Sequence, residues 1–402
     1  MSSFRQNIKV RSPAKLNLTF DITGSLPGGY HEVETLMQAI SLEDELEFEF
    51  DFSSDRFIVE IAEIEIDQIE IAEIDIAEIE SYSALASVPN DANNLISKAA
   101  HLFHQQCATN EKCRISCKLK KRIPVAGGMG GGSGNAAATL VALDKAFDTR
   151  LSQEALSRLA SQLGSDVPFF LSGGTQIGRN KGDVLAEVSD ARPVWFVVVS
   201  PRGLSLATPQ IYAEYDRHEA ENPNGLIRPD LASALESLQF RTAAVLAATT
   251  KPAATEPAAT KPAATKPAAT APMAIDLVQD LDIDHGFANV FSAMVFQKYP
   301  ALKLLADEIA STTRKAVHMT GSGPTLFICA ESEDAAAQLA SLLHGPGDVD
   351  PGAQASRLLH DLDRGAQAPR QLQYVERLQA SIYIASSIPN GVKVTSSTLA
   401  GV

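Results

Sequence analysis

The alternation of apolar and polar residues along the chain predicts a mixed α and β fold. Residues 8–22 and 40–52 alternate or run apolar and are rich in β-branched and aromatic side chains, which is typical of strands. The glycine- and proline-containing residues 24–29 predict a turn between them. Residues 113–119 predict another strand, and the apolar run at 193–200 predicts a buried one.

Helices are expected between these strands. Asn93 or Asp91 is suited to cap a helix that continues through His104. A second helix is expected at 135–147, directly after a glycine-rich run, and a third begins after the cap residue Ser152. Strands and helices together predict an α/β amino-terminal half.

Two stretches interrupt this pattern with four-copy pentapeptide repeats, at 61–80 and 251–270. In the first, isoleucines recur at spacings of three and two, which scatters them over both faces of a strand and around the circumference of a helix. No basic residue lies between Glu60 and Glu80, so we interpret this stretch as a solvated, extended insertion. In the second, a proline at every fifth residue excludes a regular helix and favours an extended linker.

A third insertion, polar and containing glycine and proline, spans about 345–370. Without the three insertions about 300 residues remain, a size at which two domains are usual. We therefore expect an amino-terminal domain at 1–185 with an insertion at 58–80, and a carboxy-terminal domain at 186–402. The second domain would carry a linker at 243–272 as well as the polar insertion.

Composition restricts the class of protein. With 402 residues, 45% of them hydrophobic, the chain is long enough to bury a large core. A formal net charge of −15 argues against broad binding to nucleic acid or to an anionic membrane. No apolar run is long enough to cross a bilayer, so we expect a cytoplasmic protein, either a monomer or a homodimer. The cysteines lack the paired spacing of a zinc site, and we expect reduced thiols at Cys107, Cys113, Cys117 and Cys329.

The glycine-rich run at 124–135 is the first candidate for chemistry. Glycine lets the backbone approach a phosphate closely, and the unpaired N–H groups in the first turn of the following helix would point at it. We therefore expect an enzyme that handles phosphate. A flexible linker is the alternative, but the run continues directly into the helix expected at 135–147.

Three known phosphate loops do not account for this run. A Walker loop ends in Gly-Lys followed by Ser or Thr, and the chain contains no Gly-Lys pair. The dinucleotide fingerprint matches only weakly, as Gly132, Gly134 and Ala137, because no convincing acidic residue ends a second strand. A protein-kinase loop would be accompanied by His-Arg-Asp and Asp-Phe-Gly segments, and both are absent.

Three further segments carry candidate residues, each with a purely structural alternative. A second glycine-rich turn at 319–327 lies between two apparent strands and could equally be an ordinary hairpin. Asp166 lies at the start of a short helix with proline in its first turn, where an N-cap is the common role. Lys15 stands on an otherwise apolar strand, where lysine is usually an edge residue with its ammonium in solvent.

In this order, the segments resemble those of the GHMP kinase superfamily. The resemblance rests on Pro-Ala-Lys-Leu-Asn-Leu at 13–18 and Pro-Gly-Gly-Tyr-His-Glu at 27–32. The second motif, together with Leu-Met-Gln-Ala-Ile-Ser-Leu-Glu-Asp at 36–44, is similar to the branch that phosphorylates 4-diphosphocytidyl-2-C-methyl-D-erythritol. Outside the insertions, the resemblance extends from residue 8 to about 394. It implies a two-domain α+β fold, with a ribosomal-protein-like amino-terminal domain and a ferredoxin-like carboxy-terminal domain.

The resemblance also implies a role for each matching residue. Asp166 would be the catalytic base, and Lys15 would orient the substrate hydroxyl and offset its developing charge. Tyr30 and His31 would stack on and hydrogen bond to the cytidine end of the substrate. The residues implied to bind ATP, with Mg²⁺ bridging its phosphates, are Asn94, Pro124, Ala126, Gly127, Gly128, Met129, Gly130, Gly131, Gly132, Ser133, Gly134 and Asn135. The residues implied to bind the substrate are Asn17, Tyr30, His31, Thr208, Gly321, Ser322 and Gly323.

The glycine loop departs from the family pattern, which usually reads Gly-Leu-Gly-Gly-Gly-Ser-Ser-Asn. Met129 replaces the leucine, which is a tolerable change in volume. Gly134 replaces the second serine, and we expect the lost hydroxyl to remove a contact to a phosphate oxygen or to the metal.

The resulting hypothesis is ATP-dependent phosphorylation of the 2-hydroxyl of 4-diphosphocytidyl-2-C-methyl-D-erythritol, in the non-mevalonate pathway to isoprenoid precursors. Two alternatives stay open. One is another small-alcohol kinase of the superfamily, such as a mevalonate or homoserine kinase. The other is a non-catalytic member that binds ligands, against which the presence of both Lys15 and Asp166 argues.

Overall fold

The structure is a computed structural model of the 402-residue chain. It describes residues 4–66, 88–108, 110–188, 194–221, 226, 228–229, 231–237, 287–344 and 380–401. The expected linker at 243–272, the polar insertion at 345–370 and most of the first repeat lie outside the described residues.

The larger of two sheets is antiparallel apart from one strand at its edge. Its path runs β11-β1-β2-β4-β3, and β5 pairs with β2 and β6 beside this path. The strands are β1 (Phe4–Leu26), β2 (Tyr30–Asp51), β3 (Ile58–Ile66), β4 (Arg114–Lys121), β5 (Thr175–Arg179), β6 (Val184–Val188) and β11 (Lys393–Gly401). Among the described strands of this sheet, only β3 runs parallel to a neighbour, β4.

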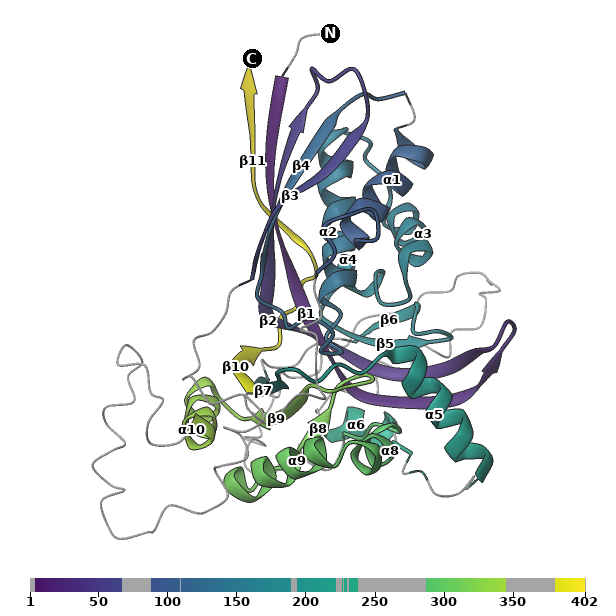
Figure 1. Ribbon diagram of the computed structural model, residues 1–402, viewed down its shortest axis with the longest axis vertical. Coiled ribbons are helices and arrows are strands. Elements are labelled where there is room, and N and C mark those ends of the chain that lie inside the picture. The colour runs from purple at the N-terminus through teal and green to yellow at the C-terminus, as the bar shows by residue number, and fades with distance from the viewer. Residues whose placement is uncertain are drawn as a thin grey trace, which may run out of the picture.

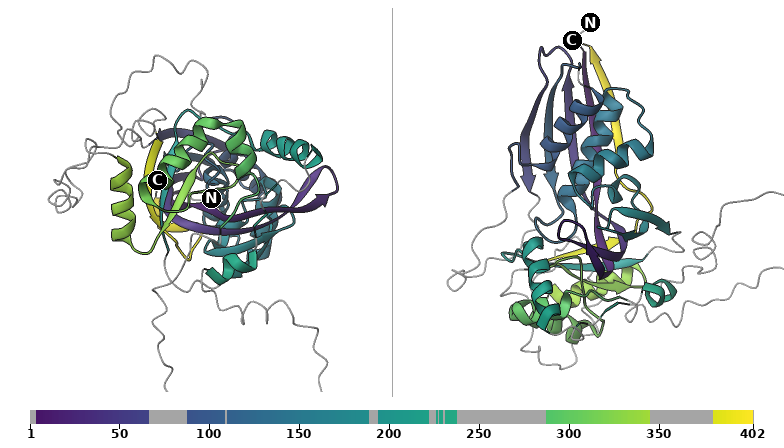
Figure 2. Two further views of the ribbon diagram at one scale, coloured as in Figure 1. Left: turned by 90° about the horizontal axis from the view of Figure 1, so that it is seen from below. Right: turned by 90° about the vertical axis from the view of Figure 1, so that its right-hand side faces the viewer.

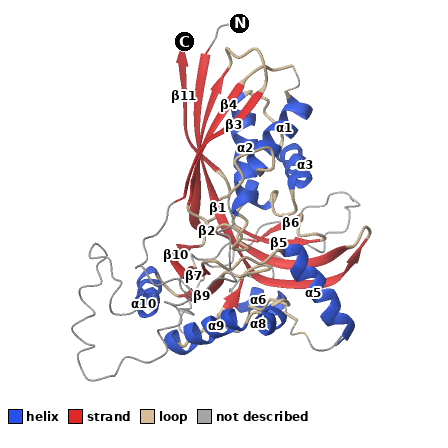
Figure 3. Cartoon of the chain, viewed as in Figure 1, coloured by secondary structure: helices blue, strands red, loops and turns tan. Residues whose placement is uncertain are grey.

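Helices cover one face of this sheet (Figures 1 and 3). They are α1 (Leu95–Cys107), α2 (Gly131–Ala146), α3 (Gln153–Leu163) and α4 (Phe169–Ser172). Burial alternates over the first residues of β1: Ile8 and Val10 are buried, whereas Lys9 pairs with Glu47 on the outer face. This period of two explains why one face of the sheet meets the helices and the other carries ion pairs.

The smaller sheet has the order β10-β7-β9-β8. Its strands are β7 (Trp195–Pro201), β8 (His318–Met319), β9 (Leu326–Ala330) and β10 (Ala380–Ser386). The helices around it are α5 (Thr208–Glu221), α6 (Leu231–Ser237), α8 (Ser292–Lys298), α9 (Pro300–Thr313) and α10 (Glu333–His344). As expected for 193–200, β7 is almost entirely buried.

The hairpin of β1 and β2 joins the two halves of the molecule. In Figure 1 it runs from the top of the larger sheet to a tip beside α5. Ala14, Leu16 and Leu18 of β1 pack in one core cluster with Phe196 and Phe327 of the smaller sheet. The hairpin therefore holds residues near its middle, Lys15 among them, between the two sheets.

The carboxy-terminal strand returns to the first sheet. β11 pairs antiparallel with β1 from Phe4↔Gly401 to Arg11↔Lys393, so both ends of the described chain meet at one end of the molecule (Figure 2). The division into domains at 185 and 186 stays a prediction.

Most expected elements are present, with local corrections. The helix expected at 135–147 begins four residues earlier, at Gly131, because the last glycines of the run are themselves helical. The cap of α1 is Asn94, not Asn93 or Asp91, and its side chain accepts a hydrogen bond from the Ile96 backbone.

The first repeat contributes an ordered strand. Ile61 lies opposite Cys117 and Ile64 opposite Leu119, both on the helix-covered face, because the register shifts between Ile61 and Glu63. This bulge leaves one residue of β3 unpaired, so side chains three positions apart share a face. The expectation that these isoleucines scatter over both faces is therefore wrong for the described part of the repeat.

All four cysteines are free thiols. Burial raises the pKa of Cys113 to about 12, so this thiol stays protonated near neutral pH. Among the described residues, no helix is both long and apolar enough to span a membrane.

Candidate active site

The glycine run forms the turn that opens α2. Gly128 (φ +77°) and Gly130 (φ +70°) have left-handed backbone conformations that favour glycine. The Lys15 backbone N–H donates to Met129 O at 3.1 Å and fixes the loop to β1. The first residues of α2 line a pocket, which is the position that an anion cradle requires.

This loop pocket, of about 330 Å³, is lined by nearly every residue predicted to bind ATP. The predicted residues in its lining are Asn94, Pro124, Ala126, Gly127, Gly128, Met129, Gly130, Gly131, Gly132, Ser133 and Asn135. Asn94 uses its amide to cap α1 and to donate to Pro89 O at 2.6 Å, so it shapes the wall. The buried Oδ1 of Asn135 has no hydrogen-bond partner in the described part of the chain.

Gly134 is the exception. It is not part of the loop pocket, and a Cβ built on it would overlap Ser12 Oγ and lie 3.2 Å from Pro13 O. The absence of a serine at this position therefore removes no group that faces the pocket.

A buried cation lies beneath the loop, a feature that sequence reasoning missed. Lys121 Nζ donates to Asp44 Oδ2 at 2.6 Å and to Ile123 O at 2.7 Å. A Cβ at Gly131 would lie only 2.7 Å from this ammonium. Burial lowers the pKa of Lys121, and the Asp44 carboxylate opposes that shift.

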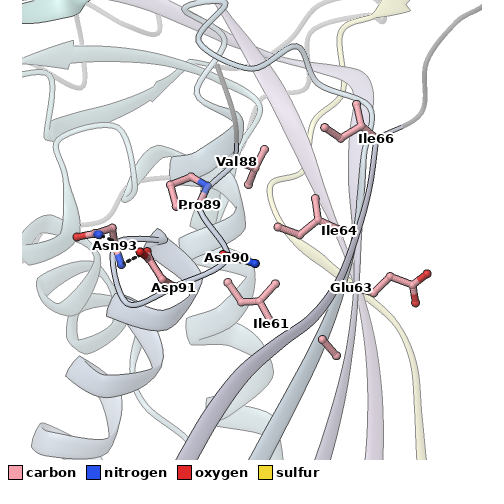
Figure 4. Close-up of a pocket in the computed structure, with 10 residues that line it drawn as sticks. Ile61, Glu63, Ile64, Ile66, Val88, Pro89, Asn90, Asp91 and Asn93 are labelled. Atoms are coloured by element: carbon pink, nitrogen blue, oxygen red, sulfur yellow. Dashed lines mark hydrogen bonds between the residues drawn. The ribbon is translucent and has the colours of Figure 1, made fainter. Parts of the chain in front are cut away.

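A second, more open pocket adjoins the loop pocket. This strand pocket, of about 750 Å³, lies between β3 and the segment before α1, and shares Val88, Pro89 and Asn93 with the loop pocket. Figure 4 shows Ile61 and Ile64 facing Val88 and Pro89 across it, with Glu63 pointing away. The two pockets therefore share a wall, and the strand pocket adds the apolar side chains of β3.

Lys15 and Asp166 form an ion pair on the other side of the glycine loop. Lys15 Nζ lies 3.6 Å from Asp166 Oδ2, and the lysine side chain is 5% exposed. The ammonium also donates to Asn17 Oδ1. The Asn17 amide in turn donates to Thr35 Oγ1 at 2.8 Å, which orients its oxygen toward Lys15. The reading of Lys15 as a solvated edge residue is therefore wrong.

Asp166 does not cap a helix. It lies in the turn before α4, whose N-cap position is Pro168, and its side chain is 36% exposed. Phe169 and Phe170 are fully buried and anchor this turn to the core. A carboxylate that is fixed at one end and open at the other can accept a proton from a bound molecule.

These two residues line a third pocket of about 260 Å³, the lysine pocket. Its lining includes the predicted residues Asn17, Thr208, Gly321 and Ser322 together with Lys15 and Asp166. Gly128 and Gly130 line both this pocket and the loop pocket. The two pockets therefore meet at the glycine loop, next to the ion pair.

The second glycine-rich turn packs against the first. β8 and β9 do form a hairpin, and its turn lies so close that a Cβ at Gly128 would be 2.8 Å from Thr320 O. Asn289 Nδ2 donates to Met319 O and Gly321 O, both at 2.8 Å, and holds the turn in place. Gly323 belongs to the same turn, outside the lining of the lysine pocket.

Tyr30 and His31 lie at the tip of the β1–β2 hairpin, outside the lining of the lysine pocket. The His31 ring packs on Tyr212 of α5 at a centroid distance of 4.9 Å, and its Nε2 lies 2.6 Å from Asp216 Oδ1. Tyr212 also lines the lysine pocket, and burial raises its pKa, with a further contribution from the Asp166 charge. Tyr212 thus connects the hairpin tip to the ion pair.

Sequence reasoning missed Tyr212 and Lys181, which both line the lysine pocket. Tyr212 stands four residues after Thr208 on α5, and this helical spacing is a signal that could have indicated a shared face. Lys181, in the turn between β5 and β6, carries no comparable signal.

Known proteins resemble this chain in sequence and in fold. Residues 94–174 match the family model of the GHMP kinases N terminal domain. A 4-diphosphocytidyl-2-C-methyl-D-erythritol kinase of Pelotomaculum thermopropionicum is 31% identical, over 82% of this chain and 91% of the relative. The enzyme of the same name from Leifsonia xyli subsp. xyli is 36% identical, over 60% and 72%.

A solved structure shows the same fold. The crystal structure of a 4-(cytidine 5'-diphospho)-2C-methyl-D-erythritol kinase matches with a TM-score of 0.55 at 24% identity, over 83% of this chain and 94% of that one. Together with the two relatives, this identifies the chain as a member of the 4-diphosphocytidyl-2-C-methyl-D-erythritol kinase family of the GHMP kinases.

Proposed function

We propose that the protein transfers the γ-phosphoryl group of ATP to the 2-hydroxyl of 4-diphosphocytidyl-2-C-methyl-D-erythritol. The observation that carries the proposal is the meeting of two pockets at Gly128 and Gly130, beside the pair of Lys15 and Asp166. A phosphoryl donor in one pocket and an acceptor hydroxyl in the other would approach each other there. Phosphoryl transfer depends mainly on such positioning and on charge stabilisation.

Asp166 acts as the general base in this proposal. Its exposed carboxylate accepts the proton of the substrate hydroxyl, while the Lys15 ammonium stabilises the negative charge that develops on the hydroxyl oxygen. Asn17 holds the ammonium in place through its Oδ1. The buried lysine cannot swing into solvent, so its charge stays where it is needed.

The loop pocket fits a nucleoside triphosphate. Backbone N–H groups at the start of α2 would bind the phosphates, with the Lys121 ammonium below them, and the strand pocket offers apolar side chains to a base. The described residues hold no cluster of three or more His, Cys, Asp or Glu side chains suited to a metal. Mg²⁺, which would neutralise phosphate charge, would therefore take most of its ligands from phosphate oxygens and water, with the Ser133 hydroxyl in the pocket lining.

A coupled assay of ADP release tests this function. We expect turnover with 4-diphosphocytidyl-2-C-methyl-D-erythritol and none with mevalonate or homoserine, and phosphorus NMR should place the new phosphate on the 2-hydroxyl. Asp166→Asn should lower kcat by about a hundredfold or more, the usual range for loss of a general base. Equal turnover by the unaltered chain and Asp166→Asn would overturn the catalytic assignment, and a preference for mevalonate or homoserine would overturn the substrate.

A further inference from the structure

Lys181 makes an unusual contact at the hairpin tip. Its ammonium lies 3.8 Å from the ring centroid of Tyr30, whose side chain is otherwise largely exposed. Lys181 belongs to the turn between β5 and β6, and this turn is held against the hairpin because Val33 N donates to Asn180 O at 2.7 Å. The contact therefore joins two elements that are fixed relative to each other.

The same lysine lines the pocket that contains the catalytic pair. Lys181, Lys15 and Asp166 all belong to the lining of the lysine pocket. Lys181 thus contacts Tyr30 and lines the same pocket as Asp166.

The charge of Lys181 is not neutralised by the protein. Lys15, the other cation of the lysine pocket, is paired with Asp166. Lys181 forms no ion pair with a carboxylate in the part of the chain that the structure describes, and its one interaction through the ammonium is with the Tyr30 ring. A lysine held by an aromatic face keeps its positive charge available to an anion.

We propose that Lys181 binds the diphosphate of the substrate and thereby sets the specificity for a nucleoside diphosphate derivative. This inference rests on the proposed function. A substrate with its hydroxyl at Asp166 and its base near Tyr30 must place its two phosphates between them, and Lys181 contacts Tyr30 and lines the pocket of Asp166. The ammonium lies over the Tyr30 ring, and Tyr30 is still 55% exposed, which leaves it accessible to a base.

Two ligands separate this role from a structural one. Cytidine carries the base without phosphates, whereas cytidine diphosphate adds the anionic group. Both ligands are titrated calorimetrically into the full chain and into its Lys181→Met variant. The variant should bind cytidine diphosphate about five- to tenfold more weakly than the unaltered chain, as expected for the loss of one charge-assisted contact. Its affinity for cytidine should stay within about twofold, as for loss of a weak exposed cation–π contact.

Matched variants complete the test. Lys181→Arg keeps the charge and should retain most of the affinity for cytidine diphosphate. Lys145→Met removes an exposed lysine near the far end of α2 and should change neither affinity. In steady-state assays, Lys181→Met should raise KM for the substrate and leave kcat within about twofold. This is expected for a group that binds the substrate but does not contact the phosphoryl group that is transferred.

The outcomes are distinct. Equal loss of both affinities in Lys181→Met would show that the lysine acts through Tyr30, and no loss would show that it binds nothing; either result overturns the inference while leaving the proposed function intact. If the unaltered chain binds neither cytidine nor its diphosphate, the proposed function itself fails, and the inference with it.

Discussion

Gly134 offers a sharp test of how the glycine loop is built. The family pattern has serine at this position, and the simplest expectation is that Gly134→Ser restores a hydroxyl to the phosphate site. The structure predicts otherwise, because Gly134 faces Ser12 and Phe170 in the interior and does not line the loop pocket. The substitution should therefore change stability rather than the affinity for ATP.

The size of the stability change follows from the contacts that the added atoms would make. A Cβ at 134 overlaps Ser12 Oγ, lies 3.2 Å from Pro13 O and 3.4 Å from Phe170 Cδ1, so Ser12 must move in a fully buried site. Overpacking of this kind costs about 1–3 kcal/mol of unfolding free energy. Ser12 Oγ has no hydrogen-bond partner in the described part of the chain, and Ser12→Ala removes a buried polar group. That change should be neutral or stabilising by up to about 1 kcal/mol.

A double-mutant cycle measures the effect by urea denaturation of the ligand-free chain. Gly134→Ser alone should lower the unfolding free energy by about 2 kcal/mol, but by less than about 1 kcal/mol in the Ser12→Ala background, a coupling of at least about 1 kcal/mol. KM for ATP should stay within about twofold in all three variants. The reasoning would be refuted if the two substitutions changed the unfolding free energy additively, or if Gly134→Ser markedly lowered KM for ATP.

Two further outcomes are expected. Gly130→Ala forces alanine into φ +70° with its Cβ 2.6 Å from a ring atom of Phe170, and should cost about 2–3 kcal/mol of unfolding free energy. Gly132→Ala, with no atom closer than 3.6 Å, should change it by less than about 0.5 kcal/mol in the same ligand-free denaturation, and equal losses would contradict the prediction. Burial lowers the pKa of His318 from 6.5 to about 4. Because the unfolded chain then binds the proton more tightly, stability is full above about pH 6.5 and falls toward pH 4, by about 2 kcal/mol at pH 5. His318→Phe should flatten this fall in urea titrations at pH 7 and pH 5, and an unchanged slope would exclude His318 as its source.

Local patterns predicted most elements because the physics that forms them is local. The cap Ser152, the buried strand at 193–200 and the hairpin around 319–327 needed only neighbouring residues. The start of α2 was predicted too late because glycine has a low helix propensity. At Gly131 this propensity is outweighed by burial and by the close approach of Lys121, which leaves no room for a side chain. The pairing of β11 with β1 has no local signal, since it joins residues at opposite ends of the chain.

The first repeat was located correctly from the sequence, but the faces on which its isoleucines lie were predicted wrongly. Its spacing of three and two fits neither a regular strand nor a helix, and a bulge at Ala62 reconciles it with a strand. Ile61 and Ile64 then face the core side, while Glu63 and Glu65 form ion pairs with Lys118 and Lys120 on the outer side. In this described part of the repeat, one extra residue thus restores the strand's period of two.

The candidate site depends on contacts between residues that are distant in the sequence, and no sequence motif reveals such contacts. Lys15 and Asp166 lie far apart in the sequence, and they meet because the middle of β1 is covered by the turn before α4. Gly128 and Gly130 line both the loop pocket and the lysine pocket, and a Cβ at either position would overlap atoms packed against the loop, Thr320 O at Gly128 and the Phe170 ring at Gly130. The glycines therefore do more than let a backbone approach phosphate. They let the second glycine-rich turn and Phe170 pack directly against the loop, and Met129 between them is buried and anchors the loop to the core.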